Sequence, residues 1–175
     1  MGSFNHKSFQ ILVRVATITT VALASVAYPA AASAHSMSDS NFYLPDAAAS
    51  KTVSVSRADN AQAGVIVMTE AIAIKESGPK QTVAKFGEVY AFSPNFIGIQ
   101  RDVPTAITFW NLQPDDEHDF MLAAPDSSVL MHAKLPPLSK TSFVFTFHKE
   151  GLYNFYCGMH QPEMNGQILV TAPAH

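Results

Sequence analysis

The sequence predicts an all-β fold, a Greek-key β-sandwich or flattened barrel of seven to eight strands. Short segments rich in β-branched and aromatic residues alternate apolar with polar positions, as strands do. Gly, Pro, Asn and Asp separate these segments, and such residues are typical of turns. No internal repeat and no long helical period interrupts the pattern. Two sheets packed around one shared core would satisfy all three observations.

The predicted strands follow one another at short intervals. The first is a β-branched run at 64–75, although the apolar pattern alone leaves a short helical turn open for its first half. It stops at a turn over 76–79, after which residues 80–85 are expected to return as a partner strand. Phe143, Phe145 and Phe147 share one face and are predicted core residues. Further strands are predicted at 90–92, 96–99, 105–111, 118–122, 141–147, 151–156 and 166–170.

Residues 1–34 have the composition of a secretory signal peptide. Two basic residues precede an apolar run, and small residues before position 35 would allow cleavage there. An uncleaved membrane anchor is the alternative, because residues 15–34 are about as long as a minimal span of ~20 residues. Pro29 and the small residues favour cleavage. We therefore expect a periplasmic or otherwise exported protein that contacts a membrane only through a partner or through such an anchor.

Residues 35–63 are rich in Ala, Ser, Asp and Asn, with only scattered apolar side chains. This composition predicts a flexible N-terminal arm. Residues 64–175 would then form one domain. If cleavage exposes His35, its amine and imidazole are a conceivable second metal site, but a solvated terminal histidine is the simpler interpretation.

Charge and cysteine content exclude some functions. Without residues 1–34, nine Lys and Arg residues stand against fourteen Asp and Glu residues, so no basic surface for nucleic acid is expected. Cys157 is the one cysteine of the chain. An exported chain permits disulfides, but this thiol has no intramolecular partner. Cys157 therefore needs another role.

The loop at 157–164 concentrates soft metal ligands: the Cys157 thiolate, the His160 imidazole and the Met164 thioether. Two imidazoles and a thiolate with a weak, long Met bond hold a mononuclear electron-transfer copper. The strand period places Cys157 on an inward face. Glu163 is the alternative axial group, a harder donor that would point away from Met164 in an extended loop. One histidine is still missing.

His118 begins an apolar strand face that continues with Phe120 and Leu122. Taken alone, such a histidine is more often a buried residue with satisfied hydrogen bonds than a metal ligand. It follows an acidic turn at 113–117 and is itself followed by Asp119.

The stretch Tyr-Asn-Phe-Tyr-Cys-x₂-His-x₃-Met-x-Gly-x-Ile at 153–168 resembles the last two strands of the cupredoxins, the blue or type 1 copper proteins of plastocyanin and azurin type. The resemblance spans 90–171. In that family the upstream copper ligand opens a strand at the position of His118. The resemblance thus implies His118, Cys157 and His160 as trigonal ligands of one copper and Met164 as its axial ligand.

Two features depart from the family pattern. Plastocyanin-like members have four residues between the last His and Met and amicyanin-like members have two, whereas three separate His160 from Met164. No subfamily is therefore assigned. Asp119 stands where the family often has Asn, and a carboxylate accepts hydrogen bonds without donating them unless it is protonated.

The resemblance implies single-electron transfer between redox partners, such as a c-type cytochrome or a terminal oxidase, by a monomer that is not an enzyme. The alternative is a periplasmic copper carrier or oxidase-assembly factor on the same fold, although such proteins usually bind copper through Met and His clusters. A dinuclear electron-entry site needs two bridging thiolates, and this chain has one cysteine. A copper nitrite reductase needs a second domain, or a trimer interface with further histidines, for its catalytic copper, and the sequence shows neither. A red-copper enzyme would need an open coordination position at the metal.

Overall fold

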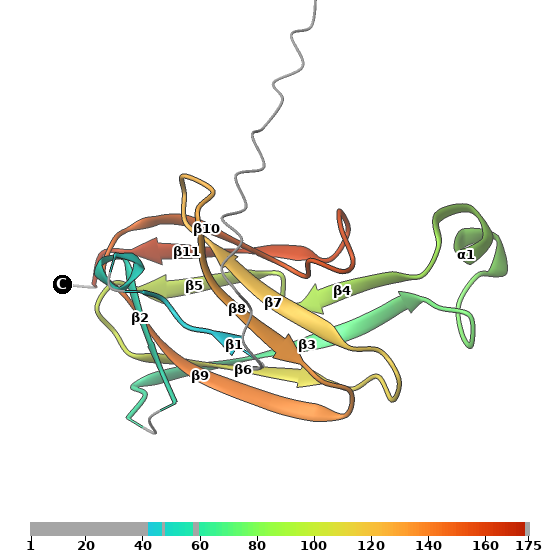
Figure 1. Ribbon diagram of the computed structural model, residues 1–175, viewed down its shortest axis with the longest axis horizontal. Coiled ribbons are helices and arrows are strands. Elements are labelled where there is room, and N and C mark those ends of the chain that lie inside the picture. Colours follow the sequence, from blue (N-terminus) through green and yellow to red (C-terminus); the bar gives the residue numbers. More distant parts are fainter. Residues whose placement is uncertain (1–41, 47, 58–59, 174–175) are drawn as a thin grey trace, which may run out of the picture. The chain divides into compact units, whose positions relative to one another are not determined.

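The computed structural model describes residues 42–46, 48–57 and 60–173, which form two β-sheets packed face to face (Figure 1). Short helices stand between some of the strands. In chain order the elements are β1 (Phe42–Tyr43), the 3₁₀ turn η1 (Ala49–Lys51), β2 (Val53–Ser56), β3 (Ala63–Ala73), α1 (Lys80–Phe86), β4 (Val89–Ser93), β5 (Phe96–Gln100), β6 (Thr105–Asn111), β7 (His118–Ala123), β8 (Val129–Leu135), β9 (Ser139–Phe147), β10 (Gly151–Tyr156) and β11 (Asn165–Thr171).

The strand order confirms the predicted sandwich. One sheet has six strands in the order β1-β8-β7-β10-β11-β5, and the other has five in the order β2-β9-β6-β3-β4. β11 pairs in parallel with β5 and β3 in parallel with β6, while the other pairs are antiparallel. The described residues hold more strands than the seven to eight expected, because β8 and the short β1 and β2 were not anticipated.

Aromatic rings from both sheets fill the core. The predicted row Phe143, Phe145 and Phe147 on β9 is fully buried, which confirms its assignment to the interior. Phe120 of the opposite sheet lies with its ring centroid 4.4 Å from that of Phe109 and 5.6 Å from that of Phe155. Such tilted contacts between aromatic rings fill the space between the two sheets.

Residues 80–85 are helical, so the expectation of a returning strand is wrong. Pro79 precedes the helix, and Gly87 follows it with a φ of 82°, a left-handed conformation that glycine adopts without steric cost. No residue of α1 is buried. Because none of its residues is buried, this segment has no packed apolar face that would favour pairing in a sheet.

The arm expected at 35–63 also needs correction where the structure describes it. β2 pairs with β9 over Val53 to Ser56, and Val53 is fully buried. β1 pairs with β8. These strands are short and lie at sheet edges, so their alternation covers too few residues to stand out from the polar composition around them.

The signal peptide or anchor expected at 1–34, and the possible metal site at His35, lie outside the described residues. Within the described part of the chain, no helix has the length and apolar character needed to cross a membrane.

One end of the sandwich brings distant segments together. β7 begins there at His118, and β10 ends there at Tyr156, which pairs with Met121 of β7. The loop 157–164 then leads into β11. Gly166 at the start of β11 lies so close to the Phe155 ring and the Asn95 carbonyl that a Cβ atom would overlap both. The chain thus passes very near its own core beside this loop.

Candidate metal centre

His118 reaches the interior from the first position of β7. It is fully buried, and its register partner on β8 is Leu135. Phe120 and Leu122 on the same face are also buried, as the alternating pattern predicted. The histidine is therefore held by a paired strand and not by a free loop.

Cys157 and His160 come from the loop between β10 and β11. Cys157 is fully buried, which confirms its predicted inward face, and Tyr153 and Phe155 on the same face of the preceding strand are also fully buried. The Cys157 N–H donates to the Met164 carbonyl at 3.0 Å, and the Met164 N–H donates to the His160 carbonyl at 3.0 Å. These backbone bonds close the loop into a fixed turn.

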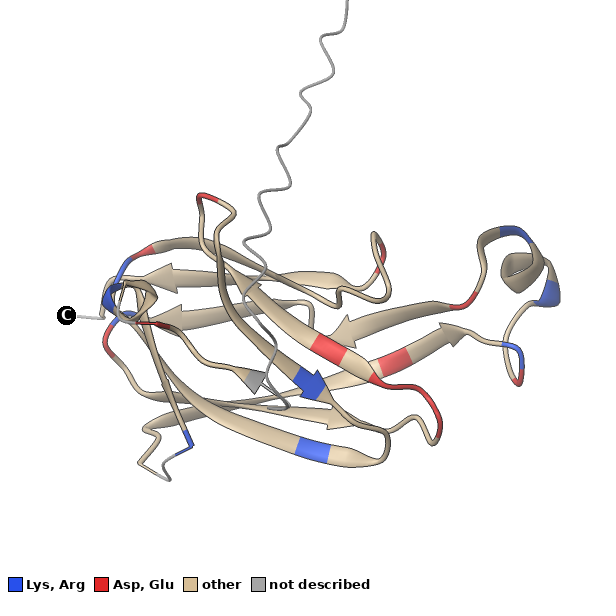
Figure 2. Ribbon diagram, in the orientation of Figure 1, with Lys and Arg blue, Asp and Glu red and all other residues tan. Residues whose placement is uncertain are grey.

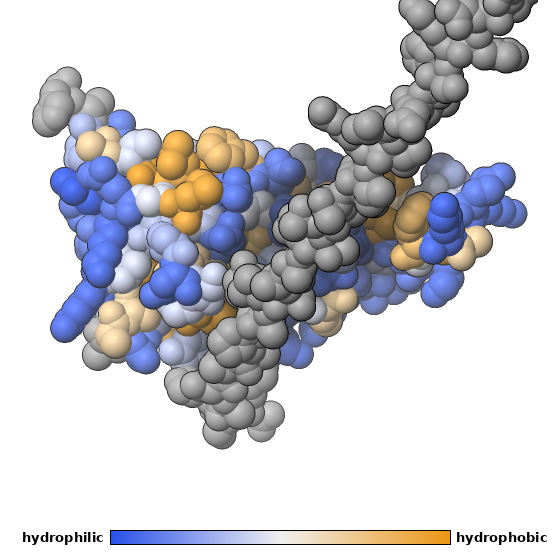
Figure 3. Space-filling view, turned by 90° about the horizontal axis from the view of Figure 1, so that it is seen from above, coloured by the Kyte–Doolittle hydropathy of each residue, from blue (hydrophilic) through white to orange (hydrophobic). Residues whose placement is uncertain are grey.

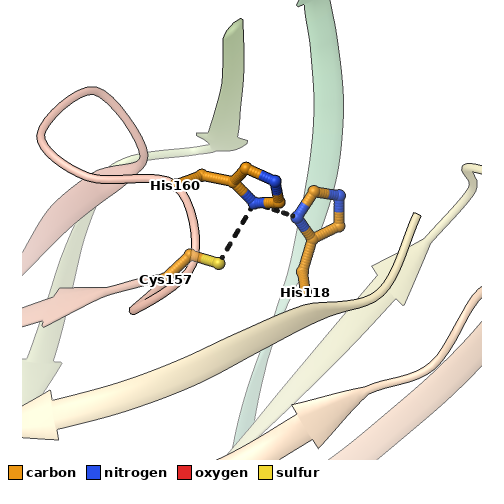
Figure 4. Close-up of side chains that lie close together, drawn as sticks. All are labelled: His118, Cys157 and His160. Atoms are coloured by element: carbon orange, nitrogen blue, oxygen red, sulfur yellow. Dashed lines mark hydrogen bonds between the residues drawn. The ribbon is translucent and has the colours of Figure 1, made fainter. Parts of the chain in front are cut away.

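The three predicted donors converge (Figure 4). His118 Nδ1 lies 3.1 Å from His160 Nδ1, and Cys157 Sγ lies 3.4 Å from the same His160 nitrogen. One donor atom from each residue lies within 4.8 Å of the other two. Since both imidazoles present Nδ1, the arrangement offers two nitrogen donors and one sulfur donor to a single ion.

The two candidates for a fourth ligand lie in different environments. Met164 is fully buried and belongs to the same core cluster as Cys157. Glu163 is exposed. A thioether, two imidazoles and a thiolate form the donor set that suits a mononuclear electron-transfer copper. The residues present therefore fit copper, and the axial role of Met164 stays a prediction.

Burial favours the neutral forms of Cys157 and His118. It raises the pKa of the Cys157 thiol to about 11, against a smaller opposing effect of the Asp119 N–H, which points at the sulfur from 3.5 Å. Burial, followed by repulsion from His160, lowers the pKa of His118 to about 4. A bound cation would reverse this preference by ionising the thiol, so metal binding would release a proton.

Two neighbours of His118 were not identified from the sequence. The Tyr90 ring packs against both imidazoles, with centroids 4.9 Å from that of His118 and 4.5 Å from that of His160. Gln113 is buried, and its Oε1 lies 3.2 Å from His118 Nε2. Both contacts depend on residues from separate strands or turns, and no local sequence pattern signals them.

The acidic turn at 113–117 stands beside this centre, between β6 and β7 (Figure 2). Tyr90 OH donates to Asp116 Oδ2 at 2.8 Å. Glu117 Oε1 forms an ion pair with Lys134 Nζ at 3.1 Å. Part of the acidic charge is therefore already occupied by contacts within the domain.

A β-sandwich with two histidines and one cysteine converging at one end defines the class of small mononuclear copper proteins. The sequence model of the family described as "Cupredoxin-like domain" matches residues 48–170. The chain belongs to that family. Together, the family and the converging donors give one copper ion as the cofactor.

Solved structures resemble the fold at low sequence identity. Auracyanin B is 16% identical with a TM-score of 0.50, covering 69% of this chain and 99% of that one. Auracyanin A from Chloroflexus aurantiacus, a blue copper protein, is 15% identical with a TM-score of 0.44, covering 62% and 98%. A purple cupredoxin from Nitrosopumilus maritimus is 19% identical with a TM-score of 0.40, covering 61% and 99%. No curated protein matches the sequence.

Proposed function

We propose that this protein is an exported, non-enzymatic carrier of single electrons that cycles one copper ion between Cu(II) and Cu(I). His118, Cys157 and His160 would supply the trigonal ligands, and Met164 the weak axial ligand. The convergence of one ring nitrogen from each histidine and the Cys157 Sγ within 4.8 Å carries the proposal.

The enclosure of the site favours electron transfer over bond chemistry. His118 and Cys157 are fully buried, and the Tyr90 ring covers both imidazoles. These groups leave little room for a substrate next to the donors. His118 is held by a paired strand, and Cys157 and His160 by a loop closed through backbone hydrogen bonds, so a change in copper charge would require little movement of the protein. Small rearrangement is what rapid electron exchange needs.

His160 is the ligand best placed to pass electrons to a partner. It is only partly buried, and its neighbour Met159 is 50% exposed. A redox protein docking on this loop would come close to the copper through one imidazole ring. A c-type cytochrome or a terminal oxidase is the kind of partner we propose, with the protein acting as a monomer.

A copper carrier or oxidase-assembly factor is the competing function. Carriers must release their metal, and a buried thiolate held by a closed loop opposes release. The proposed export rests on the signal-like composition of residues 1–34 and places the protein in the periplasm or an equivalent compartment.

Visible absorption and electron paramagnetic resonance spectra of the Cu(II)-loaded protein test this function. We expect an intense thiolate-to-copper band and the spectrum of a mononuclear site. Cys157→Ser should fold but lose the band, whereas Met131→Leu, a buried core change away from the loop, should keep it. A wild-type protein without the band, or one that gives up copper to a chelator during repeated reduction and oxidation, would favour the carrier instead.

A further inference from the structure

Gln113 is a buried polar residue in a turn whose other residues are exposed or partly exposed. Its side chain lies behind His118, at the ring nitrogen opposite the one that faces the other donors. A buried amide must use its donors and acceptor on protein groups, because leaving them unpaired is costly. The surrounding hydrogen bonds therefore determine which way the amide points.

The orientation is set first at Asn111, the last residue of β6. Its Nδ2 donates to the carbonyl of Asp116 at 2.8 Å and to that of Leu135 at 2.9 Å. Both amide hydrogens are thereby used. The Asn111 Oδ1 must then face the other way, where it accepts the backbone N–H of Gln113 at 3.1 Å. This bond anchors the main chain of Gln113.

The side chain of Gln113 is oriented in turn by Thr69 of β3. Gln113 Nε2 donates to the backbone carbonyl of Thr69 at 3.0 Å, so the amide nitrogen points to β3. The amide oxygen then points to His118 and also lies beside the Thr69 hydroxyl, whose one hydrogen is within reach of both this oxygen and Asn111 Oδ1. A reversed amide would place two acceptors, the Thr69 carbonyl and Gln113 Oε1, against each other.

An acceptor 3.2 Å from His118 Nε2 requires that nitrogen to carry the proton. The neutral imidazole has one N–H, so Nδ1 then has the free lone pair, and Nδ1 is the atom that faces His160, whose own Nδ1 lies beside Cys157 Sγ. We propose that Gln113 is a positioning residue that fixes His118 as the Nε2–H tautomer and thereby directs Nδ1 to the copper.

This role has an electronic consequence. A hydrogen bond from Nε2–H to an oxygen acceptor makes the opposite nitrogen a stronger donor. A stronger nitrogen donor stabilises Cu(II) more than Cu(I). Gln113 therefore lowers the reduction potential compared with an apolar residue at the same position. Only this consequence rests on the proposed function, because the tautomer exists in the metal-free protein as well.

The tautomer is tested without copper, by nitrogen-15 NMR of the imidazoles in the metal-free protein at pH 7. We expect His118 to show a protonated Nε2 with a slowly exchanging hydrogen. Gln113→Leu should lose that slow exchange and mix the two tautomers, while Gln113→Glu should retain the Nε2–H form because a carboxylate oxygen still accepts. Gln167→Leu, on the outer part of β11, is the matched control. A wild-type His118 protonated at Nδ1 overturns the proposal, whether or not any variant folds.

Copper binding supplies the second measurement. Gln113→Leu should weaken Cu(II) binding about tenfold or more, as the loss of such a partner typically does. It should also raise the reduction potential, whereas Gln113→Glu should lower it. Shifts of the same sign in both variants would mean that the amide only fills space, and unchanged affinity and potential in both would equally reject the positioning role. A colourless wild-type protein with the expected tautomer would reject the electron-transfer function and leave the tautomer assignment standing.

Discussion

Asp119 joins the two segments that carry the candidate ligands, because its Oδ1 accepts a hydrogen bond from the backbone N–H of Gly158. Asp119 follows His118 directly, and Gly158 follows Cys157 directly. The second carboxylate oxygen, Oδ2, pairs with His132 Nε2 at 2.9 Å. A backbone donor on one side and an imidazole on the other suit an acceptor-only carboxylate, so Asp replaces the family's frequent Asn without an unpaired polar group.

Removing this hydrogen bond between Asp119 and Gly158 should weaken the attachment of the copper loop to β7. Asp119→Ala leaves the Gly158 N–H without its acceptor, and we expect a loss of about 1–3 kcal/mol in the free energy of unfolding, together with weaker copper binding. Asp119→Asn retains one acceptor oxygen and should cost less. The comparison is made by urea unfolding and by copper titration.

Asp126 offers the matched control, because its Oδ1 likewise accepts a backbone N–H, that of Ser128 at 3.0 Å, in the turn between β7 and β8. Asp126→Ala should leave copper binding unchanged. If Asp119→Ala binds copper as tightly as Asp126→Ala does, the tie between the two segments has no influence on the site.

Gly166 provides a test of packing beside the copper loop. A Cβ atom there would overlap the ring of Phe155 and the carbonyl of Asn95, one of which is a backbone group that cannot rotate away. Gly166→Ala should therefore destabilise the metal-free protein by about 1–3 kcal/mol, the usual cost of overpacking. Gly98→Ala is the control, since no atom lies within 4 Å of its added Cβ. Equal unfolding midpoints in urea for the two variants would contradict the close approach.

Local patterns were sufficient to predict the main strands and the soft donors of the loop at 157–164, whereas His118 as a ligand followed only from the resemblance to the cupredoxins. Cys157, His160 and Met164 are close in sequence, and the period of β7 and β10 determines which side chains point inward. Longer-range relations were not predictable in this way. The place of Tyr90 over the two imidazoles depends on how β4 packs against the opposite sheet, and no pattern within β4 encodes that contact.

Short or exposed segments were the other limit. The helix α1 was expected to be a strand because periodicity gives no decision over so few residues. β2 was missed because only Val53 of its four residues is buried, within a segment of polar composition. In both cases the sequence carries too little apolar patterning to distinguish an ordered edge element from a connection.

The axial position is tested by exchanging donor types. Met164→Gln replaces a soft thioether with a harder oxygen that binds Cu(II) better, so the reduction potential should fall. Glu163→Gln should leave the potential nearly unchanged, because Glu163 is exposed. Voltammetry of the two variants decides between them: a shift in Glu163→Gln alone would assign the axial role to Glu163.

The stability of the metal-free protein should depend on pH through His118. Its pKa is lowered from 6.5 to about 4 by burial and by His160, so the folded protein prefers the neutral imidazole. The contribution of this preference to the free energy of unfolding is complete above the pKa of His118 in the unfolded protein. It is lost as the pH falls from about 6.5 towards 4. The full loss is on the order of 3 kcal/mol.

Carboxylates titrate over part of the same pH range, so the effect of His118 must be measured as the difference between the wild type and a variant without this imidazole. The free energy of unfolding is determined at several pH values for the wild type and for His118→Asn, which has no titrating ring. The wild type should lose more stability on acidification than the variant. Parallel pH curves would show that protonation of His118 is not coupled to unfolding.

The last prediction concerns where electrons leave the protein. Met159 is 50% exposed and stands next to His160, and Pro162 of the same loop is also exposed. Short-lived redox complexes bury small areas, less than ~1,200 Å², so a single charge placed at the centre of such a contact has a large effect. Met159→Lys, and separately Pro162→Glu, should slow electron exchange with the partner while leaving the copper spectrum nearly unchanged.

The control for this docking surface is Leu152→Lys. Leu152 is an exposed apolar residue on β10, paired with Leu169 of β11, and Figure 3 shows that apolar side chains are also exposed elsewhere, among hydrophilic ones. A partner that recognised exposed apolar side chains in general would respond to all three variants. Stopped-flow rates that fall for Met159→Lys and Pro162→Glu but not for Leu152→Lys would place docking at the His160 loop. Rates unchanged in all three variants would place the docking surface away from both the His160 loop and Leu152. The acidic turn at 115–117 would then be the next segment to alter, because it lies beside His118, the other histidine of the site.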